Sequence, residues 1–324
     1  MFLVDRCRPP VAFAVVLITG LGLTGILGLK VGDPPGQQMQ TFATVFLDML
    51  EPNQREQALM GFDSQDRVGW HFIPKTSRKG LMMGDMNDAQ QTAALRLVRS
   101  ALSEAGYFKA NRIMLLEEVL NEFEAGKGTW QRDPKRYYVT IFGDPTESSS
   151  SPKWGLSFEG HHLSLNFVCE GGRVVDSTPQ FMASNPATVM SDTSSTLGKG
   201  TRVLAAEEQL AFNLINMLTD KQQATAIIAD EAPAELRFAG EAQAAVGSPE
   251  GITFEQLGPK QRALLKELVA LYFDVAPDRV AKTRHAIAEE DGWDGVRFAW
   301  SGATEPGIGH YYRIRGERFL IEFV

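Results

Sequence analysis

The chain has 324 residues, of which 44% are hydrophobic and 22% are charged, and its formal net charge is −8. A chain of this length can bury a substantial core, as one large domain or as two ordinary ones. The negative charge, with no basic face along the sequence, argues against a nucleic-acid partner, because phosphate binding needs clustered cations. Only two cysteines are present, Cys7 and Cys169, so we expect no disulfide within the folded part.

We expect residues 1–30 to be a signal peptide or a membrane anchor. Arg6 and Arg8 precede an uncharged run over residues 11–29, which is long enough to cross a bilayer as a hydrophobic helix. A cleaved signal stays open, but no clear cleavage site follows the run. The two arginines place the N-terminus in the cytoplasm, so the rest of the chain should be exported to a periplasmic or extracellular setting. Residues 31–41 are rich in glycine and proline and should be a linker.

The spacing of apolar residues predicts helices in the first part of the chain. A helical stripe over residues 42–50 breaks at Pro52 and then resumes. A further helix is expected over 88–105 with Gly106 as its C-cap, followed by another helix over 113–123. The first half should therefore begin with paired helices.

Strand signals follow these helices. Residues 137–142 are aromatic and β-branched, and residues 154–167 suggest two strands folded at Gly160. Residues 137–177 are therefore expected to form an antiparallel meander. Residues 179–200 should be a polar connection on the surface.

The same order of signals returns in the second half of the chain. We expect helices over 204–218, 221–229, 259–273 and 277–290, and strands over 296–300 and 310–323.

Three blocks of the first half match blocks of the second half in the same order. The matches are 47–54 with 215–222, 80–102 with 251–273, and 158–167 with 314–323. Chance likeness between amphipathic helices and glycine hairpins is the alternative explanation. The matches predict an α+β fold of two tandem halves in a pseudo-two-fold arrangement, each a helix pair followed by an antiparallel β-hairpin. These internal repeats should span about residues 42–178 and 204–324.

Four short blocks carry a resemblance to a known family. They are Gly160–Phe167, Thr178–Pro179, Asn185–Pro186 and His310–Ile314. Together they resemble the bacterial family known as domain of unknown function 3500, over roughly residues 42–324. The resemblance implies a fold and an exported setting, but no mechanism. Family members continue into a polar tail with further histidines and a tryptophan, so we expect either a truncation at Val324 or a site that lacks a piece.

His161, His162 and His310 are the candidate catalytic and metal-ligating residues. A neutral imidazole can bind a divalent metal or act as a general base. If the strand is extended, side chains alternate and His162 should be more exposed than His161. The alternative is that each histidine is hydrogen-bonded and pins a turn. Metal-binding, phosphate-binding and nucleophilic-serine motifs are all absent, so the cofactor is unknown beyond a possible divalent metal.

Two classes of function stay open. One is a metal-assisted hydrolase or oxidoreductase of the cell envelope that uses the three histidines near the junction of the two hairpins. The other is a non-catalytic module that binds a small molecule or an envelope protein. The repeat places His310 against Trp154 and His161 against Glu317. The histidines are therefore not symmetry copies, and a shared site would have to form across the pseudo-axis.

Overall fold

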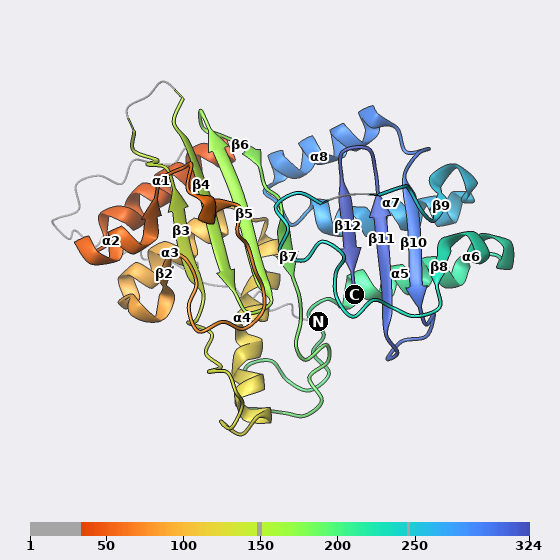
Figure 1. The fold of residues 1–324 in the computed structure, drawn as a ribbon, viewed down its shortest axis with the longest axis horizontal. Coiled ribbons are helices and arrows are strands. Elements are labelled where there is room, and N and C mark those ends of the chain that lie inside the picture. Colours follow the sequence, from red (N-terminus) through yellow and green to blue (C-terminus); the bar gives the residue numbers. More distant parts are fainter. Residues whose placement is uncertain (1–33, 148–150, 245–246) are drawn as a thin grey trace, which may run out of the picture. The chain divides into compact units, whose positions relative to one another are not determined.

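The computed structural model describes residues 34–147, 151–244 and 247–324, which belong to one compact unit. The predicted signal or anchor and the start of the predicted linker lie outside these residues. Within them, no helix has both the length and the apolar character needed to cross a membrane. The described part contains eight α-helices and two mixed sheets (Figure 1). The α+β fold class predicted from the sequence is confirmed.

The first sheet and its helices come from the N-terminal half of the described residues. The helices are α1 (Pro35–Asp48), α2 (Pro52–Ala58), α3 (Asp88–Ser100) and α4 (Glu104–Phe123). The strands are β1 (Leu59–Met60), β2 (Leu81–Met82), β3 (Tyr138–Phe142), β4 (Lys153–Gly160), β5 (Leu163–Glu170), β6 (Arg173–Asp176) and β7 (Gln180–Met182). Strand β1 pairs with β3 in parallel, and the other pairs in this sheet are antiparallel. The predicted meander is therefore present as β3 to β6.

The second sheet and its helices come from the C-terminal half. The helices are α5 (Ala205–Met217), α6 (Asp220–Ala226), α7 (Pro259–Phe273) and α8 (Asp278–Asp291). The strands are β8 (Ile227–Ala229), β9 (Ile252–Thr253), β10 (Arg297–Gly302), β11 (His310–Arg315) and β12 (Leu320–Phe323). Strand β8 pairs with β10 in parallel, and β9, β10, β11 and β12 form antiparallel pairs.

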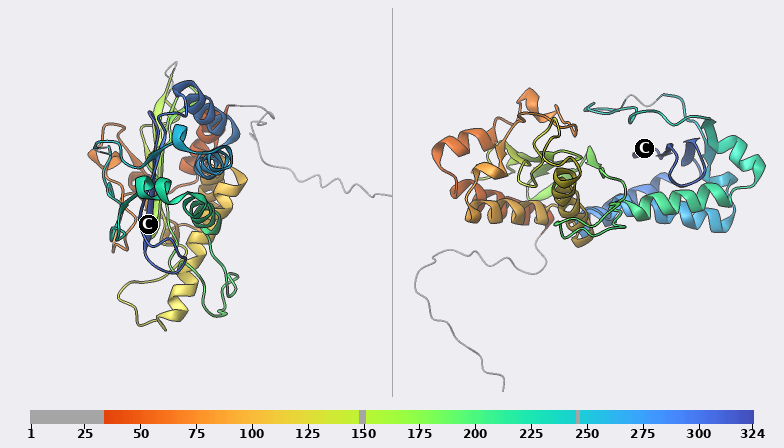
Figure 2. Two further views of the ribbon diagram at one scale, coloured as in Figure 1. Left: turned by 90° about the vertical axis from the view of Figure 1, so that its right-hand side faces the viewer. Right: turned by 90° about the horizontal axis from the view of Figure 1, so that it is seen from below.

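Each sheet has its own hydrophobic core. Helices α1, α3 and α4 pack with the first sheet (Figure 2). Trp154 and Phe158 of this sheet are buried with Leu97 and Ile113 of the helices. The second core gathers the aromatic side chains of β10 and β11 with those of α5 and α7. Burial of such large apolar side chains is the main stabilising term for both halves.

Two local predictions were wrong. Helix α1 begins at Pro35 and occupies most of the predicted linker, because proline is well suited to the first helical position and Met39 is fully buried in the core. Gly106 does not end a helix but lies inside α4, whose N-cap Ser103 accepts a hydrogen bond from the Gly106 N–H. The glycine is needed for contact: an ideal Cβ there would lie 2.3 Å from the Val275 carbonyl oxygen.

We expect Gly106→Ala to destabilise the protein although alanine is the better helix former. The added methyl group would collide with the Val275 backbone, which also accepts a hydrogen bond from the Ser103 N–H at 2.8 Å. The free energy of unfolding should fall by about 1–3 kcal/mol, measured by urea denaturation. Gly295→Ala is the matched control, because a Cβ at that residue would have no heavy atom within 4 Å. Equal or greater stability of Gly106→Ala would contradict the close contact.

Candidate functional site

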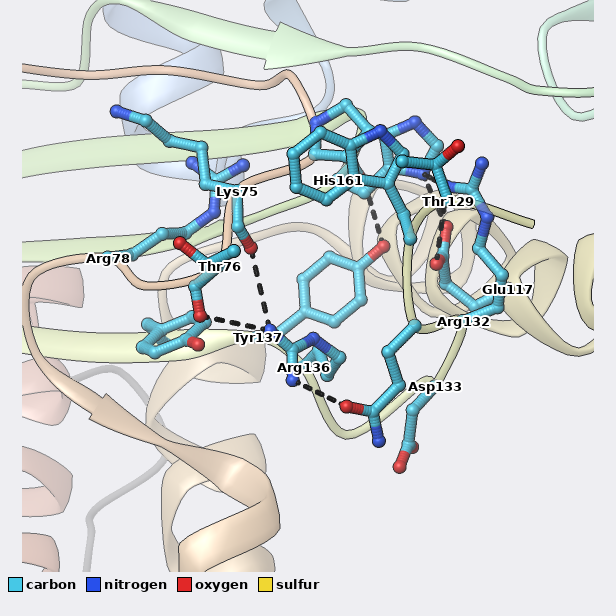
Figure 3. Close-up of a pocket in the computed structure, with 14 residues that line it drawn as sticks. Lys75, Thr76, Arg78, Glu117, Thr129, Arg132, Asp133, Arg136, Tyr137 and His161 are labelled. Carbon is cyan, nitrogen blue, oxygen red and sulfur yellow. Dashed lines mark hydrogen bonds and ion pairs between the residues drawn. The ribbon is translucent and has the colours of Figure 1, made fainter. Parts of the chain in front are cut away.

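A pocket of about 390 Å³ opens at the N-terminal end of β3 (Figure 3). Its walls come from residues 74–78, from α4, from residues 129–138 and from the turn between β4 and β5. Figure 3 shows His161, Glu117 and Arg132 together on one side of this pocket. Pockets of this size hold small molecules.

The central contact joins His161 to Glu117. Nδ1 of His161 lies 2.5 Å from Oε1 of Glu117, and both side chains are about nine-tenths buried or more. Because an ionised carboxylate only accepts hydrogen bonds, Nδ1 must carry the proton and donate it to Glu117. In a neutral ring with this tautomer the lone pair is on Nε2, and both hydrogen-bond contacts given for the ring within the described residues are to Nδ1.

Arg132 compensates the negative charges of two nearby carboxylates, Glu117 and Glu124. Its Nε and Nη2 donate to Glu124, at 3.1 Å and 2.7 Å, and its Nη1 lies 3.9 Å from Oε2 of Glu117. The hydrogen bond from Arg132 lowers the pKa of Glu124. Nη1 also lies 3.3 Å from Nδ1 of His161, but an arginine cannot accept the imidazole proton, so the carboxylate decides the tautomer.

Tyr137 holds the histidine turn in place. Its ring is fully buried, and its hydroxyl donates to the backbone carbonyl of His161 at 2.8 Å. Burial raises the pKa of Tyr137 well above its usual value, so the hydroxyl stays a donor. A Cβ on Gly160 would meet the Tyr137 ring at 2.2 Å, which explains the glycine there.

His161 and His162 together form the turn between β4 and β5, so the alternation expected for an extended strand does not apply to them. His162 has a φ of 60°, a rare value for a residue other than glycine. Its N–H donates to the Phe72 carbonyl at 2.8 Å, and its carbonyl accepts from the Ala183 N–H at 2.9 Å. Its Nδ1 is buried and has no hydrogen-bond partner in the described part of the chain, whereas His161 lines the pocket. Strand alternation therefore gives no reason to expect His162 to be more exposed than His161.

His310 lies elsewhere, at the start of β11. Its ring stacks on Trp300 and also contacts Phe212 and Phe323, and its Nδ1 is 3.0 Å from the Ile308 carbonyl oxygen. No contact among the described residues joins His310 to His161 or His162. In the described ranges no three metal-ligating side chains gather into a group that could hold a metal ion. The structure thus brings two of the three candidate histidines together, and one of them, His161, contacts Glu117.

Sequence reasoning missed Glu117 and the arginines of the pocket. One signal was available for Glu117, because it follows Ile113 and Leu116 at helical spacing and so places a charge on the apolar face of α4. The arginines come from irregular segments, where residue spacing does not show which way a side chain points.

A protein-family model described as "Protein of unknown function (DUF3500)" matches residues 33–324. The chain belongs to this family. The resemblance drawn from the short sequence blocks is therefore confirmed, over a slightly longer range than expected. No curated protein and no solved structure matches the chain.

We expect His162 to make the protein less stable as the pH falls. Burial lowers its pKa from 6.5 to about 3, so between these pH values the unfolded chain binds a proton that the folded protein does not. The free energy of unfolding should then fall by up to roughly 1.4 kcal/mol for each pH unit between about 6.5 and 3. His162→Asn cannot titrate and tolerates the positive φ, so its acid-side slope should be shallower. Urea denaturation at several pH values measures both slopes, and equal slopes would contradict the burial of a neutral imidazole.

Proposed function

We propose that this protein is an enzyme of the cell envelope that hydrolyses a small molecule in the Arg132–His161 pocket. His161 acts as the general base, and Glu117 is the positioning residue that orients it. The observation that carries the proposal is the 2.5 Å contact between Nδ1 of His161 and Oε1 of Glu117 at the wall of a 390 Å³ pocket.

The proposed step moves one proton and one pair of electrons. Nε2 of His161 takes a proton from a water molecule, and the water oxygen attacks an electrophilic carbon or phosphorus atom of the substrate. The imidazolium that forms lies against the Glu117 carboxylate, which stabilises its charge. The same nitrogen then returns the proton to the leaving group as its bond to the substrate breaks.

A metal-assisted form of this chemistry remains part of the proposal. An imidazole nitrogen suits a divalent ion, so Nε2 of His161 would hold it in the pocket, while Glu117 would fix the ring through Nδ1. A bound metal would supply Lewis-acid activation of water or substrate. This form assigns no ligand role to His162 or His310: the backbone of His162 bonds to Phe72, and His310 stacks on Trp300 with its Nε2 3.9 Å from Glu208.

The second candidate is a non-catalytic binding module for a small molecule or an envelope protein. It is favoured by His310, whose Nδ1 is bonded to a backbone carbonyl as expected for a structural histidine. It is disfavoured by His161, whose partner is a buried carboxylate instead of a carbonyl.

Turnover tests the enzyme proposal against the binding module. The full-length chain, purified in mild detergent, is screened against carboxylic, amide and phosphate ester substrates. His161→Gln should lower kcat/KM by about 10²–10⁴-fold, and Glu117→Gln by less, since it removes only orientation. His285→Gln, an exposed histidine bonded to Asp274, is the matched control and should keep activity.

Two further readouts separate the outcomes. Nitrogen-15 NMR should find the neutral His161 ring protonated on Nδ1, and elemental analysis of wild type and His161→Gln tests the metal-assisted form. Turnover that His161→Gln leaves unchanged would reject the catalytic role. Ligand binding without any turnover would favour the binding module.

We also propose that the folded part is exported and tethered through residues 11–29, on the evidence of Arg6, Arg8 and the uncharged run after them. A fusion of alkaline phosphatase after Gly32 should be active, because that enzyme needs the oxidising space outside the cytoplasm. A fluorescent cytoplasmic fusion of green fluorescent protein at the same residue would reverse this topology.

We further propose that the two halves are a pseudo-two-fold duplication. Support comes from two matching glutamine networks. Gln54 and Gln90 bond to each other, and Gln90 donates to the Met49 carbonyl at 2.9 Å. In the second half Gln222 and Gln261 bond in the same way, and Gln261 donates to the Met217 carbonyl at 2.9 Å. An experimental structure in which these networks or the strand orders differ would contradict the duplication.

A further inference from the structure

The pocket is cationic although the chain is acidic. Four cationic side chains line it, against the two carboxylates of Glu117 and Asp133, while the whole chain carries a net charge of −8. The cations are Lys75, Arg78, Arg132 and Arg136. A concave site with the opposite sign to the rest of the surface concentrates ligands of negative charge.

These cations differ in how far carboxylates neutralise them. Arg132 is paired with Glu124, and it also lies near Glu117. Arg78 lies 4.0 Å from Glu159, but Lys79 shares that carboxylate at 2.7 Å. The single charge of Glu159 is therefore shared by two cations, so it does not fully neutralise Arg78.

Arg136 has only neutral partners among the described residues. Its Nη1 donates to the Gln131 amide oxygen at 3.0 Å, and its Nη2 donates to the backbone carbonyls of Thr76 at 3.1 Å and Lys75 at 3.5 Å. These bonds fix the direction of the guanidinium group without neutralising its charge. A guanidinium held this way is preorganised for a carboxylate or a phosphate.

Two further observations favour an anion at this end of the pocket. Burial is the main cause that lowers the pKa of Arg78, and the nearby charge of Arg136 lowers it further, so a negative group here would relieve the repulsion. Tyr138 also lines the pocket, and within the described residues its hydroxyl has no hydrogen-bond partner. A phenol hydroxyl can donate to an oxyanion.

We propose that the guanidinium of Arg136 binds an oxyanion group of the substrate, either a carboxylate or a phosphate, with Tyr138 and Lys75 as further polar residues of the same pocket wall. The inference rests on the proposed function only for the claim that this ligand is a substrate. Figure 3 shows Arg136 and His161 on opposite sides of the Tyr137 ring. The oxyanion is therefore a recognition group at one end of the ligand, and the reacting bond lies at the His161 end.

Calorimetric titration of the full-length chain with inorganic phosphate and, separately, with succinate tests this site. The wild type should bind at least one of the two, and the arm that binds identifies the oxyanion. Arg136→Gln should weaken binding about tenfold or more, and Tyr138→Phe by a smaller factor. Arg96→Gln is the matched control, because it removes the same charge from an exposed position on α3 outside the pocket.

The outcomes keep the two proposals apart. His161→Gln should bind the anion as the wild type does while losing turnover. Equal weakening by Arg136→Gln and Arg96→Gln would mean that only net charge matters, and no binding of either probe by the wild type would equally overturn the anion site. Arg136-dependent binding with no turnover of any substrate would sustain this inference and reject the proposed hydrolase.

Discussion

The burial of the Glu117 carboxylate is the constraint on which the candidate site depends. Glu117 is 4% exposed, and an uncompensated carboxylate at that depth would cost several kcal/mol. Its compensation comes from His161 in the β4–β5 turn and from Arg132 in the segment before β3. One helix residue thereby ties two separate segments to α4, and the wall of the pocket is made of these three pieces. The same pairing that stabilises the buried charge also orients the imidazole, so one contact serves both the fold and the proposed chemistry.

Much of the fold could be predicted from periodicity because its elements are amphipathic and well bounded. Helix α7 runs from Pro259 to Phe273 as predicted, since a proline begins it and its apolar stripe is regular. The errors fall where a tertiary contact decides. Gly106 has the features of a helix C-cap in sequence, but its missing side chain is required by Val275, a contact between residues far apart in the chain. Similarly, α1 begins within a proline- and glycine-rich segment because the core buries Met39.

Only part of the candidate site could be predicted from the sequence. The His161–His162 pair could be found, because adjacent histidines in a hairpin are unusual and neutral imidazole is versatile. Their different roles could not, since both occupy a turn in which strand alternation has no meaning. Glu117 is 44 residues from His161, and no spacing rule connects them. His310 was grouped with them because it begins the C-terminal hairpin, whereas in the structure its ring packs against Phe212, Trp300 and Phe323.

The proposed duplication explains why the pocket belongs to one half. In the first half α4 and β3 are joined by residues 124–137, which supply Arg132 and Arg136, whereas in the second half α8 and β10 are joined by the short segment 292–296. The turn between β11 and β12 also lacks a histidine. Elsewhere, the residue that aligns with Lys79 also forms an ion pair, but with the opposite charge: Lys79 binds Glu159, whereas Glu250 binds Arg313, two residues from the position that aligns with Glu159. The longer connection and the histidine turn therefore supply the polar wall of the pocket in the first half, and the second half has neither feature among its described residues.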